Sequence, residues 1–244
     1  MSTQALYMRD SYLREFEATV KAVSQGKYVV LDRTAFYPNS GGQPNDTGIM
    51  TSASDGSAHR VVFVGKFGGE ISHEVENPDG SPLSEGDRVR CAIDWDRRHR
   101  LMRSHTAAHI ISGIIHQSTG ALITGNQLDT DKVRIDFSLD DYDPGKIREF
   151  ISLASARAAE GHVVAVSFIT KEEAERTEGL SKLAKGLPKD IEEIRIVDIE
   201  GIDRQADGGT HVANTGEIGG IEFLRCENKG KSNRRVYFRI VDGN

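Results

Sequence analysis

Three histidines in this sequence have the spacing and surroundings of metal ligands. His105 and His109 are four residues apart in a stretch with helical periodicity, and His211 ends the turn sequence Gly-Gly-Thr-His. Residues four apart on a helix lie on one face about 6 Å apart, so two imidazoles can bind one ion. The glycine pair before His211 lets the backbone fold tightly enough to aim a third imidazole at a neighbouring element. Together the three residues indicate a divalent metal site, although an HxxxH pair alone is more often surface or core histidines.

The other histidines are expected to lie in solvent. His116 follows His109 by seven residues, about 10 Å along a helix axis, which is too far to share an ion with His105. The isoleucines on the opposite side of this helix are expected to pack inward. No partner at a useful spacing accompanies the remaining histidines, His59, His73, His99 and His162.

The composition describes an ordinary globular protein. With 244 residues, 37% hydrophobic and 28% charged, the chain can bury the core of one large domain or two modest ones. No apolar run is long enough to span a bilayer, and the N-terminus lacks the basic start of a signal peptide. Two distant cysteines, Cys91 and Cys226, argue against a disulfide framework. We therefore expect a cytoplasmic protein without a membrane partner.

Basic residues gather in two places although the net charge is −6. Helix exposure or a solvated hairpin would explain them, but both clusters flank the expected metal site, and basic patches beside a cleft also suit a phosphodiester ligand. The candidate nucleic-acid contacts are Arg97, Arg98, Arg100 and Arg103 before the histidine pair, and Lys229, Lys231, Arg234 and Arg235 near the C-terminus.

The segment 32–48 is rich in turn-forming residues but carries more chemistry than a linker needs. Its glycines, Gly41 and Gly42, would allow close approach of the backbone to a ligand, while Thr34 and Gln43 offer hydrogen bonds. A long connection between strands explains the composition equally well. The sequence leaves both interpretations open at this point.

Apolar alternation predicts strands at 16–23, 28–31, 60–65, 70–75 and 87–93. Asp94 or Asp96 can then cap a helix that runs to about Gln117. This change of period marks a boundary, so we expect a small β-barrel-like domain at 1–93 and a second domain at 94–244. In the second domain the pattern predicts strands at 132–137, 163–169, 194–199, 218–225 and 235–241, with helices at 144–159 and 171–176. Helices packed on a largely antiparallel sheet give an α+β fold class.

Four motifs, in this order, resemble the freestanding alanyl-tRNA editing proteins called AlaX, which are similar to the editing domain of alanyl-tRNA synthetase. They are Asp-Arg-Thr-Ala-Phe-Tyr-Pro…Gly-Gly-Gln at 32–43, Arg-Ser-His-Thr-Ala-Ala-His at 103–109, Gly-Gly-Thr-His-Val…Asn-Thr-Gly-Glu-Ile-Gly at 208–219, and Glu-Asn-Lys-Gly-Lys…Arg-Arg at 227–235. The resemblance covers most of the chain, which is expected to be the medium-length form.

The resemblance implies a zinc-dependent aminoacyl-tRNA deacylase that acts in trans and without ATP. Its substrate would be tRNA(Ala) charged with serine or glycine, and no obligate protein partner is inferred. His105, His109 and His211 match the family's ligands for one zinc ion, and Thr34 matches the loop threonine that helps to judge the amino acid. Gln43 lies in the same loop, and Phe36 and Tyr37 are candidates for stacking on the terminal adenine or for apolar packing.

One position departs from the family pattern. Asp207 stands where the family usually has a cysteine, so the site is expected to be three histidines with either Asp207 or water as the fourth ligand. Thr106 occupies the place of the general-base Glu in HExxH zinc proteases, and the sequence identifies no catalytic base. A threonyl-tRNA-type editing hydrolase, a small-molecule zinc hydrolase and a non-catalytic tRNA-binding module with a degenerate metal site remain alternatives.

Overall fold

The computed structural model of the protein describes residues 2–76, 81–140, 143–177, 180 and 193–242. The chain forms two compact units, Met1–Arg100 and Leu101–Asn244, and the boundary falls within helix α1 (Trp95–Thr119). Mostly antiparallel sheets combine with few helices, which confirms the expected α+β class. None of the described helices combines the length and the apolar content that crossing a bilayer requires.

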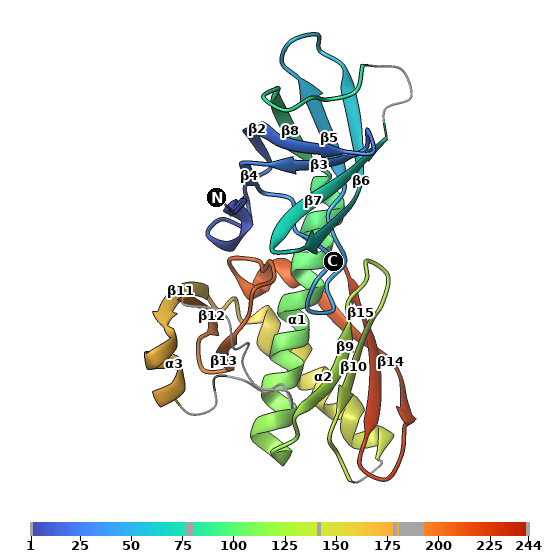
Figure 1. Ribbon diagram of the computed structural model, residues 1–244. Coiled ribbons are helices and arrows are strands. Elements are labelled where there is room, and N and C mark those ends of the chain that lie inside the picture. Colours follow the sequence, from blue (N-terminus) through green and yellow to red (C-terminus); the bar gives the residue numbers. More distant parts are fainter. Residues whose placement is uncertain (1, 77–80, 141–142, 178–179, 181–192, 243–244) are drawn as a thin grey trace. The chain divides into compact units, whose positions relative to one another are not determined.

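The first unit contains a sheet of six strands that closes on itself (Figure 1). The strands pair in the order β2-β3-β7-β6-β5-β8, and β8 pairs again with β2. They are β2 Glu15–Ser24, β3 Tyr28–Leu31, β5 Gly48–Ser52, β6 Ala58–Phe67, β7 Glu70–Glu76 and β8 Arg88–Ile93. A short parallel pair, β1 Gln4–Ala5 with β4 Arg33–Thr34, and the 3-10 helix η1 Leu6–Met8 complete the unit.

Alternation of side chains explains why these residues form a barrel. In β2 the buried positions Phe16, Ala18 and Val20 alternate with residues that are exposed. Successive side chains of a strand point to opposite faces, so one face of β2 joins the apolar core and the other meets water. The same core contains Val29, Met50, Val61, Val64 and Val89 from the other strands.

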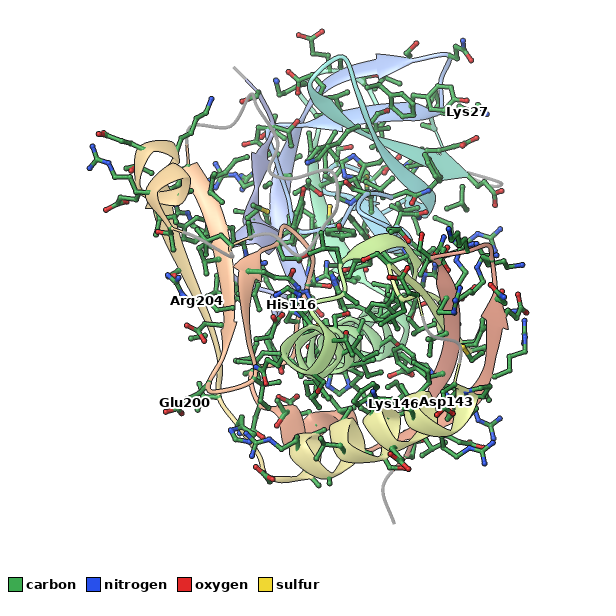
Figure 2. The ribbon with its side chains drawn as sticks, turned by 90° about the horizontal axis from the view of Figure 1, so that it is seen from below. Lys27, His116, Asp143, Lys146, Glu200 and Arg204 are labelled. Carbon is green, nitrogen blue, oxygen red and sulfur yellow. The ribbon has the colours of Figure 1, made fainter. Side chains whose placement is uncertain are left out.

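The second unit has two antiparallel sheets. One has the strand order β14-β15-β10-β9 and the other β11-β12-β13. The strands are β9 Ile123–Gln127, β10 Val133–Phe137, β11 Val164–Thr170, β12 Glu193–Ile199, β13 Asp203–Ala206, β14 Gly220–Asn228 and β15 Arg234–Val241. Helix α2 (Pro144–Ala159) packs against β14, while α3 (Lys171–Arg176) and the 3-10 helix η2 (Thr215–Ile218) are short. Figures 1 and 2 show the part of α1 in this unit between the two sheets.

The helices begin at residues that cap them. Asp143 Oδ1 accepts hydrogen bonds from the backbone N–H groups of Gly145 and Lys146, and Pro144 occupies the first turn of α2, near the labelled Asp143 and Lys146 in Figure 2. Asp94 Oδ1 accepts from the Arg97 N–H at the start of α1, as one of the two expected caps would. Both helices therefore start where the sequence predicts.

Helix α1 is buried more completely than its sequence predicts. Residues 101–115 are buried apart from the half-buried Arg103, so the histidine side and the isoleucine side both face protein. Gly113 permits this, because a β-carbon there would stand 2.6 Å from the Ile202 carbonyl oxygen between β12 and β13. The helix therefore brings its backbone directly against the turn that begins β13.

Candidate functional site

The two distant histidine motifs come together in the second unit. His105 and His109 extend from α1, and Asp207 and His211 extend from the loop after β13. Each side chain offers one ligand atom, and these four atoms lie within 4.8 Å of one another. This group could hold a metal ion, and among the described residues it brings together all the ligand candidates that the sequence suggested.

The three imidazoles converge on one carboxylate. Asp207 Oδ2 lies 3.5 Å from His105 Nε2 and 3.7 Å from His109 Nε2, and Asp207 Oδ1 lies 3.1 Å from His211 Nε2. Each ring thus presents its Nε2 atom to Asp207. Imidazole nitrogens and a carboxylate oxygen this close together form a ligand set that suits zinc and other first-row divalent ions.

Backbone contacts hold the loop that carries Asp207. Asp207 Oδ1 accepts a 2.6 Å hydrogen bond from the Gly209 N–H, so the loop folds back on its own carboxylate. Arg195 on β12 is buried and donates to the carbonyl oxygens of Asp207 and Gly209 at 2.9 and 2.8 Å. The sequence analysis did not single out Arg195, whose position on an apolar strand was its only signal.

Three further buried side chains contact the histidines from behind. Asp203 Oδ2 lies 2.9 Å from His109 Nδ1 and accepts from Gln205 Nε2 at 3.0 Å. Thr106 Oγ1 lies 3.2 Å from His211 Nδ1. Sequence reasoning missed these roles, although the polar residues 203 and 205 alternate in the short strand β13 and so share a face.

Electrostatics favour the forms that bind metal. Burial lowers the pKa of His105, and it also lowers that of His211 well below its ordinary value, with the charge of His105 adding to the effect. Burial alone would raise the pKa of Asp207, but the surrounding imidazoles, His105 above all, hold it well below the usual range. Neutral imidazoles beside an ionised carboxylate are the protonation states in which these groups bind metal.

The Gly-rich loop belongs to the first unit and is well connected there. Ser40 and Gln43 exchange backbone hydrogen bonds of 3.1 and 2.9 Å across Gly41 and Gly42, which both have positive φ (60° and 85°). This is a tight two-residue turn of the kind that glycine permits. Thr34 and Gln43 are both fully buried.

Thr34 forms a hydrogen-bonded pair with His73. His73 Nδ1 lies 2.9 Å from the Val29 carbonyl oxygen, which can only accept, so a neutral His73 ring carries its proton on Nδ1. Its Nε2 then accepts the Thr34 hydroxyl proton at 2.9 Å, and Thr34 Oγ1 in turn accepts from the Phe36 N–H at 3.1 Å. The expectation that His73 lies in solvent is wrong, and it is also wrong for His59, which is buried inside the same unit.

Two aromatic candidates of the loop are core residues. Phe36 is fully buried and meets Phe16 and His73 edge to face, with ring centroids 5.6 Å apart in each case. Tyr37 is buried against Tyr7, and its hydroxyl donates to the Ser40 carbonyl oxygen at 3.1 Å. Of the two roles considered for them, apolar packing is therefore observed, and Phe36 has no exposed ring face for an adenine.

Two of the arginines considered for tRNA binding are buried instead. Arg98 pairs with the equally buried Asp46 and donates to the carbonyl oxygens of Ser11 and Ala35 at 2.9 and 2.5 Å. Arg234 is 3% exposed and donates to the Asp140 carbonyl oxygen and to the Gly230 carbonyl oxygen, the latter at 2.7 Å. Both guanidinium groups hold backbone segments in place, so the expectation of phosphate contact is corrected for these residues.

The other basic candidates differ in exposure. Arg103 is mostly buried and donates to the Ile218 carbonyl oxygen at 2.7 Å, and Arg235 forms a two-bond ion pair with Asp136, both bonds 2.8 Å long. Arg97 is half-buried, whereas Arg100, Lys229 and Lys231 are exposed. His116 is half-buried rather than solvated, and its Nδ1 lies 3.0 Å from the Ala121 carbonyl oxygen.

The sequence families that match the chain belong to aminoacyl-tRNA synthetases. The family described as "tRNA synthetases class II (A)" matches residues 3–97, which contain the Gly-rich loop. The family described as "Threonyl and Alanyl tRNA synthetase second additional domain" matches residues 194–237, which contain Asp207 and His211. Residues 194–237, which carry two of the four metal-ligand candidates, thus match a domain that threonyl- and alanyl-tRNA synthetases share.

Full-length relatives specify the family further. The alanyl-tRNA editing protein AlaX-M of Methanosarcina acetivorans is 53% identical over 244 residues, which cover 98% of this chain and 100% of that protein. AlaX-M of Saccharolobus solfataricus is 42% identical over 98% of this chain and 99% of its own length. The alanine–tRNA ligase of Pyrococcus abyssi is 40% identical over 97% of this chain but only 26% of the ligase. The chain therefore belongs to the AlaX-M family of alanyl-tRNA editing proteins.

Proposed function

We propose that the protein removes serine, and also glycine, from mischarged tRNA(Ala) by hydrolysing the aminoacyl ester at a site that holds one zinc ion. The observation that carries the proposal is the convergence of His105, His109, Asp207 and His211 within 4.8 Å, in a chain of the AlaX-M family. Editing by residues 94–244, with the Gly-rich loop supplied by residues 1–93, is the division of labour that we propose for the two parts of the chain.

The residues present fit a divalent ion. His211 Nε2 and Asp207 Oδ1 are 3.1 Å apart, and both can be acceptors, so a cation beside them relieves the repulsion between their lone pairs. We assign His105, His109 and His211 as ligands through Nε2, with Asp207 Oδ2 as the fourth ligand. A bound zinc ion would supply a Lewis acid for the ester carbonyl group.

Selection of the amino acid is assigned to Thr34 and Gln43. The Thr34 proton goes to His73 and one of its lone pairs takes the Phe36 N–H, so a second lone pair is left for a serine hydroxyl. Gln43 supplies an amide that can donate. A site built to bind a hydroxyl can discriminate by roughly 10⁴ against a substrate that lacks it, because buried polar groups would be left unpaired. This would spare tRNA charged with alanine.

Contact with tRNA is assigned to the exposed basic residues. Lys229 and Lys231 lie at the turn between β14 and β15, and Arg100 is exposed on α1, with the half-buried Arg97 beside it in sequence. Exposed cations can neutralise phosphates and so bind RNA in a salt-dependent way. Arg98 and Arg234 are not part of this assignment, and Arg103 and Arg235 are held in protein contacts.

The test is deacylation of Ser-, Gly- and Ala-tRNA(Ala) by zinc-loaded and chelator-treated protein. We expect zinc-dependent loss of serine, and slower loss of glycine, while Ala-tRNA(Ala) survives. Asp207→Ala should abolish the reaction or slow it strongly, and Asp207→Cys should retain it. Asp131→Ala, which removes an exposed carboxylate from the same unit, is the matched control and should behave like the wild type.

Asp207 favours one competing function, a tRNA-binding module whose metal site has lost catalysis. That function predicts tRNA binding with no hydrolysis of any ester by the zinc-loaded protein. Recovery of hydrolysis in Asp207→Cys alone would then assign the loss to the ligand change. Hydrolysis of serine from tRNA(Thr) in preference to serine from tRNA(Ala) would instead support a threonyl-tRNA-type editing enzyme.

A further inference from the structure

Thr106 connects three groups through a single hydroxyl. It follows His105 on α1 and is fully buried. Its Oγ1 atom lies 3.0 Å from the Met102 carbonyl oxygen, 3.2 Å from the Val212 backbone nitrogen and 3.2 Å from His211 Nδ1. A hydroxyl has one proton and two lone pairs, so these three contacts use all of its hydrogen-bonding capacity.

The proton positions follow from what each partner can do. The Met102 carbonyl oxygen can only accept, so it takes the Thr106 proton. The Val212 N–H can only donate, so it uses one lone pair of Oγ1. The remaining lone pair faces His211 Nδ1, which must therefore carry a hydrogen. A neutral His211 ring then has its free lone pair on Nε2, the atom that faces Asp207.

Asp203 likewise determines which ring nitrogen of His109 carries the hydrogen. Its Oδ2 atom lies 2.9 Å from His109 Nδ1 and accepts a second hydrogen bond from Gln205 Nε2 at 3.0 Å. Gln205 Nε2 also lies 2.9 Å from His109 Nδ1, so the hydrogen on Nδ1 is assigned from the ionised carboxylate, which can only accept. Since the side chains of both Asp203 and Gln205 are buried, the carboxylate is held between these two donors. The hydrogen on His109 Nδ1 leaves Nε2 free, and this atom also faces Asp207.

We propose that Thr106 and Asp203 are positioning residues that fix His211 and His109 with protonated Nδ1 atoms and with Nε2 turned toward the metal. The inference rests on the proposed metal site and adds the residues that orient its ligands. Outer partners of this kind change metal affinity by about 10- to 100-fold when they are removed. Thr106 thus acts on the loop histidine from the helix position that carries a general base in HExxH enzymes.

A purely structural role for Thr106 gives a different expectation. Threonine hydroxyls on helices often bond to the carbonyl oxygen four residues earlier, and that contact concerns the helix alone. If this were its whole role, removal of the hydroxyl would change the unfolding midpoint and leave zinc affinity alone. The two roles are separated by measuring affinity and stability on the same variants.

The experiment measures zinc affinity of the full chain by competition with a chromophoric chelator. Thr106→Val keeps the shape of the side chain and loses the hydroxyl, whereas Thr106→Ser keeps the hydroxyl. We expect about 10- to 100-fold weaker zinc binding for Thr106→Val, near wild-type binding for Thr106→Ser, and weakening for Asp203→Asn. Ser112→Ala is the matched control, because the described residues give that buried hydroxyl of α1 no hydrogen-bond partner.

A second measurement reads the tautomer directly. Long-range ¹H–¹⁵N NMR correlations of the zinc-free protein should show His211 protonated at Nδ1 in the wild type and a changed tautomer population in Thr106→Val. Wild-type affinity and an unchanged tautomer in folded Thr106→Val would overturn the inference and leave the proposed function standing. Failure of the wild-type protein to bind zinc would instead overturn the proposed metal site and the inference with it.

Discussion

Gly113 and Ile202 are in backbone contact, so that a β-carbon on Gly113 would stand 2.6 Å from the Ile202 carbonyl oxygen and 3.3 Å from Asp203 Cβ. Gly113→Ala should therefore displace the start of β13. Alanine favours a helix by about 1 kcal/mol over glycine, but overpacking costs about 1–3 kcal/mol, so we expect a net loss of stability. Zinc binding should weaken too, because Asp203 moves with the turn. Urea unfolding and chelator competition measure the two effects, with the exposed Ser118→Ala on the same helix as control.

His73 should make the stability of the protein depend on pH. Burial lowers its pKa from 6.5 to about 4, although its hydrogen bond to the Val29 carbonyl opposes the shift. Unfolding restores the ordinary value, so the unfolded chain binds a proton that the fold excludes between these limits. The stabilising contribution is complete above about pH 6.5 and is lost as the pH falls toward 4, by up to about 3 kcal/mol at 1.36 kcal/mol per unit.

Urea unfolding at pH 7 and pH 4.5 tests this dependence in the wild type and in His73→Gln. The wild type should lose more unfolding free energy than the variant over this range. Other buried histidines titrate in both proteins and cancel in the comparison. An equal loss in the two proteins would contradict the assignment to His73.

Thr34 should affect both the fold and the choice of amino acid. Thr34→Val removes the donor to His73 and the acceptor for the Phe36 N–H, which should destabilise the protein by about 1–3 kcal/mol. It should also slow deacylation of Ser-tRNA(Ala) relative to Gly-tRNA(Ala), since glycine has no hydroxyl. Thr34→Ser keeps the hydroxyl and should resemble the wild type in both measurements. An equal loss of rate on both substrates in Thr34→Val would contradict a role in selection.

Arg98 should matter for stability and not selectively for tRNA. Arg98→Met leaves the buried Asp46 without its ion-pair partner, which should cost about 3–5 kcal/mol of unfolding free energy. Folded protein at low temperature should still bind tRNA with wild-type salt dependence. Arg98→Met combined with Asp46→Leu, which removes both charges, should recover part of the stability. A small change in the unfolding midpoint for Arg98→Met would contradict a stabilising role for this ion pair.

Lys229 and Lys231 should show the opposite behaviour. Replacing either by Ala should leave the unfolding midpoint nearly unchanged, because both side chains are exposed. Each should weaken tRNA binding and lower the salt slope by up to about one unit. Binding measured from 50 to 300 mM KCl tests this, with the exposed Lys132→Ala as control.

The sequence predicts the elements well because their signals are local. The expected helices at 144–159 and 171–176 coincide with α2 and α3, whose caps and first-turn proline are adjacent in sequence. The sequence missed the strands β1, β4 and β5 of the first unit. It also missed β9 and β13, since Ile-Thr-Gly-Asn-Gln and Asp-Arg-Gln-Ala lack apolar alternation. They are strands because their backbones pair with β10 and β12.

The sequence predicted only those parts of the site that depend on residues close together in the chain. The spacing of His105 and His109, and the Gly-Gly turn before His211, depend on nearby residues. Asp203 contacts His109 although the two are 94 residues apart in sequence, and no local pattern predicts that contact. The same limit produced the error at Arg98, whose partner Asp46 lies 52 residues earlier. From the sequence alone a charged residue is expected to be exposed, because only the fold shows whether a partner is buried beside it.

The register of β13 limits which sequence changes in the preceding turn the metal site can tolerate. Asp203 and Gln205 face α1, while Arg204 lies on the other side of the strand, where Figure 2 shows it pointing away from the helix, and pairs with Asp198 at 3.3 Å. The turn from β12 passes through Gly201 at φ 71°. Inserting or deleting one residue there would exchange the inward and outward side chains of β13. Substitutions in this turn at positions other than Gly201 thus keep the register of β13, whereas a change of its length by an odd number of residues does not.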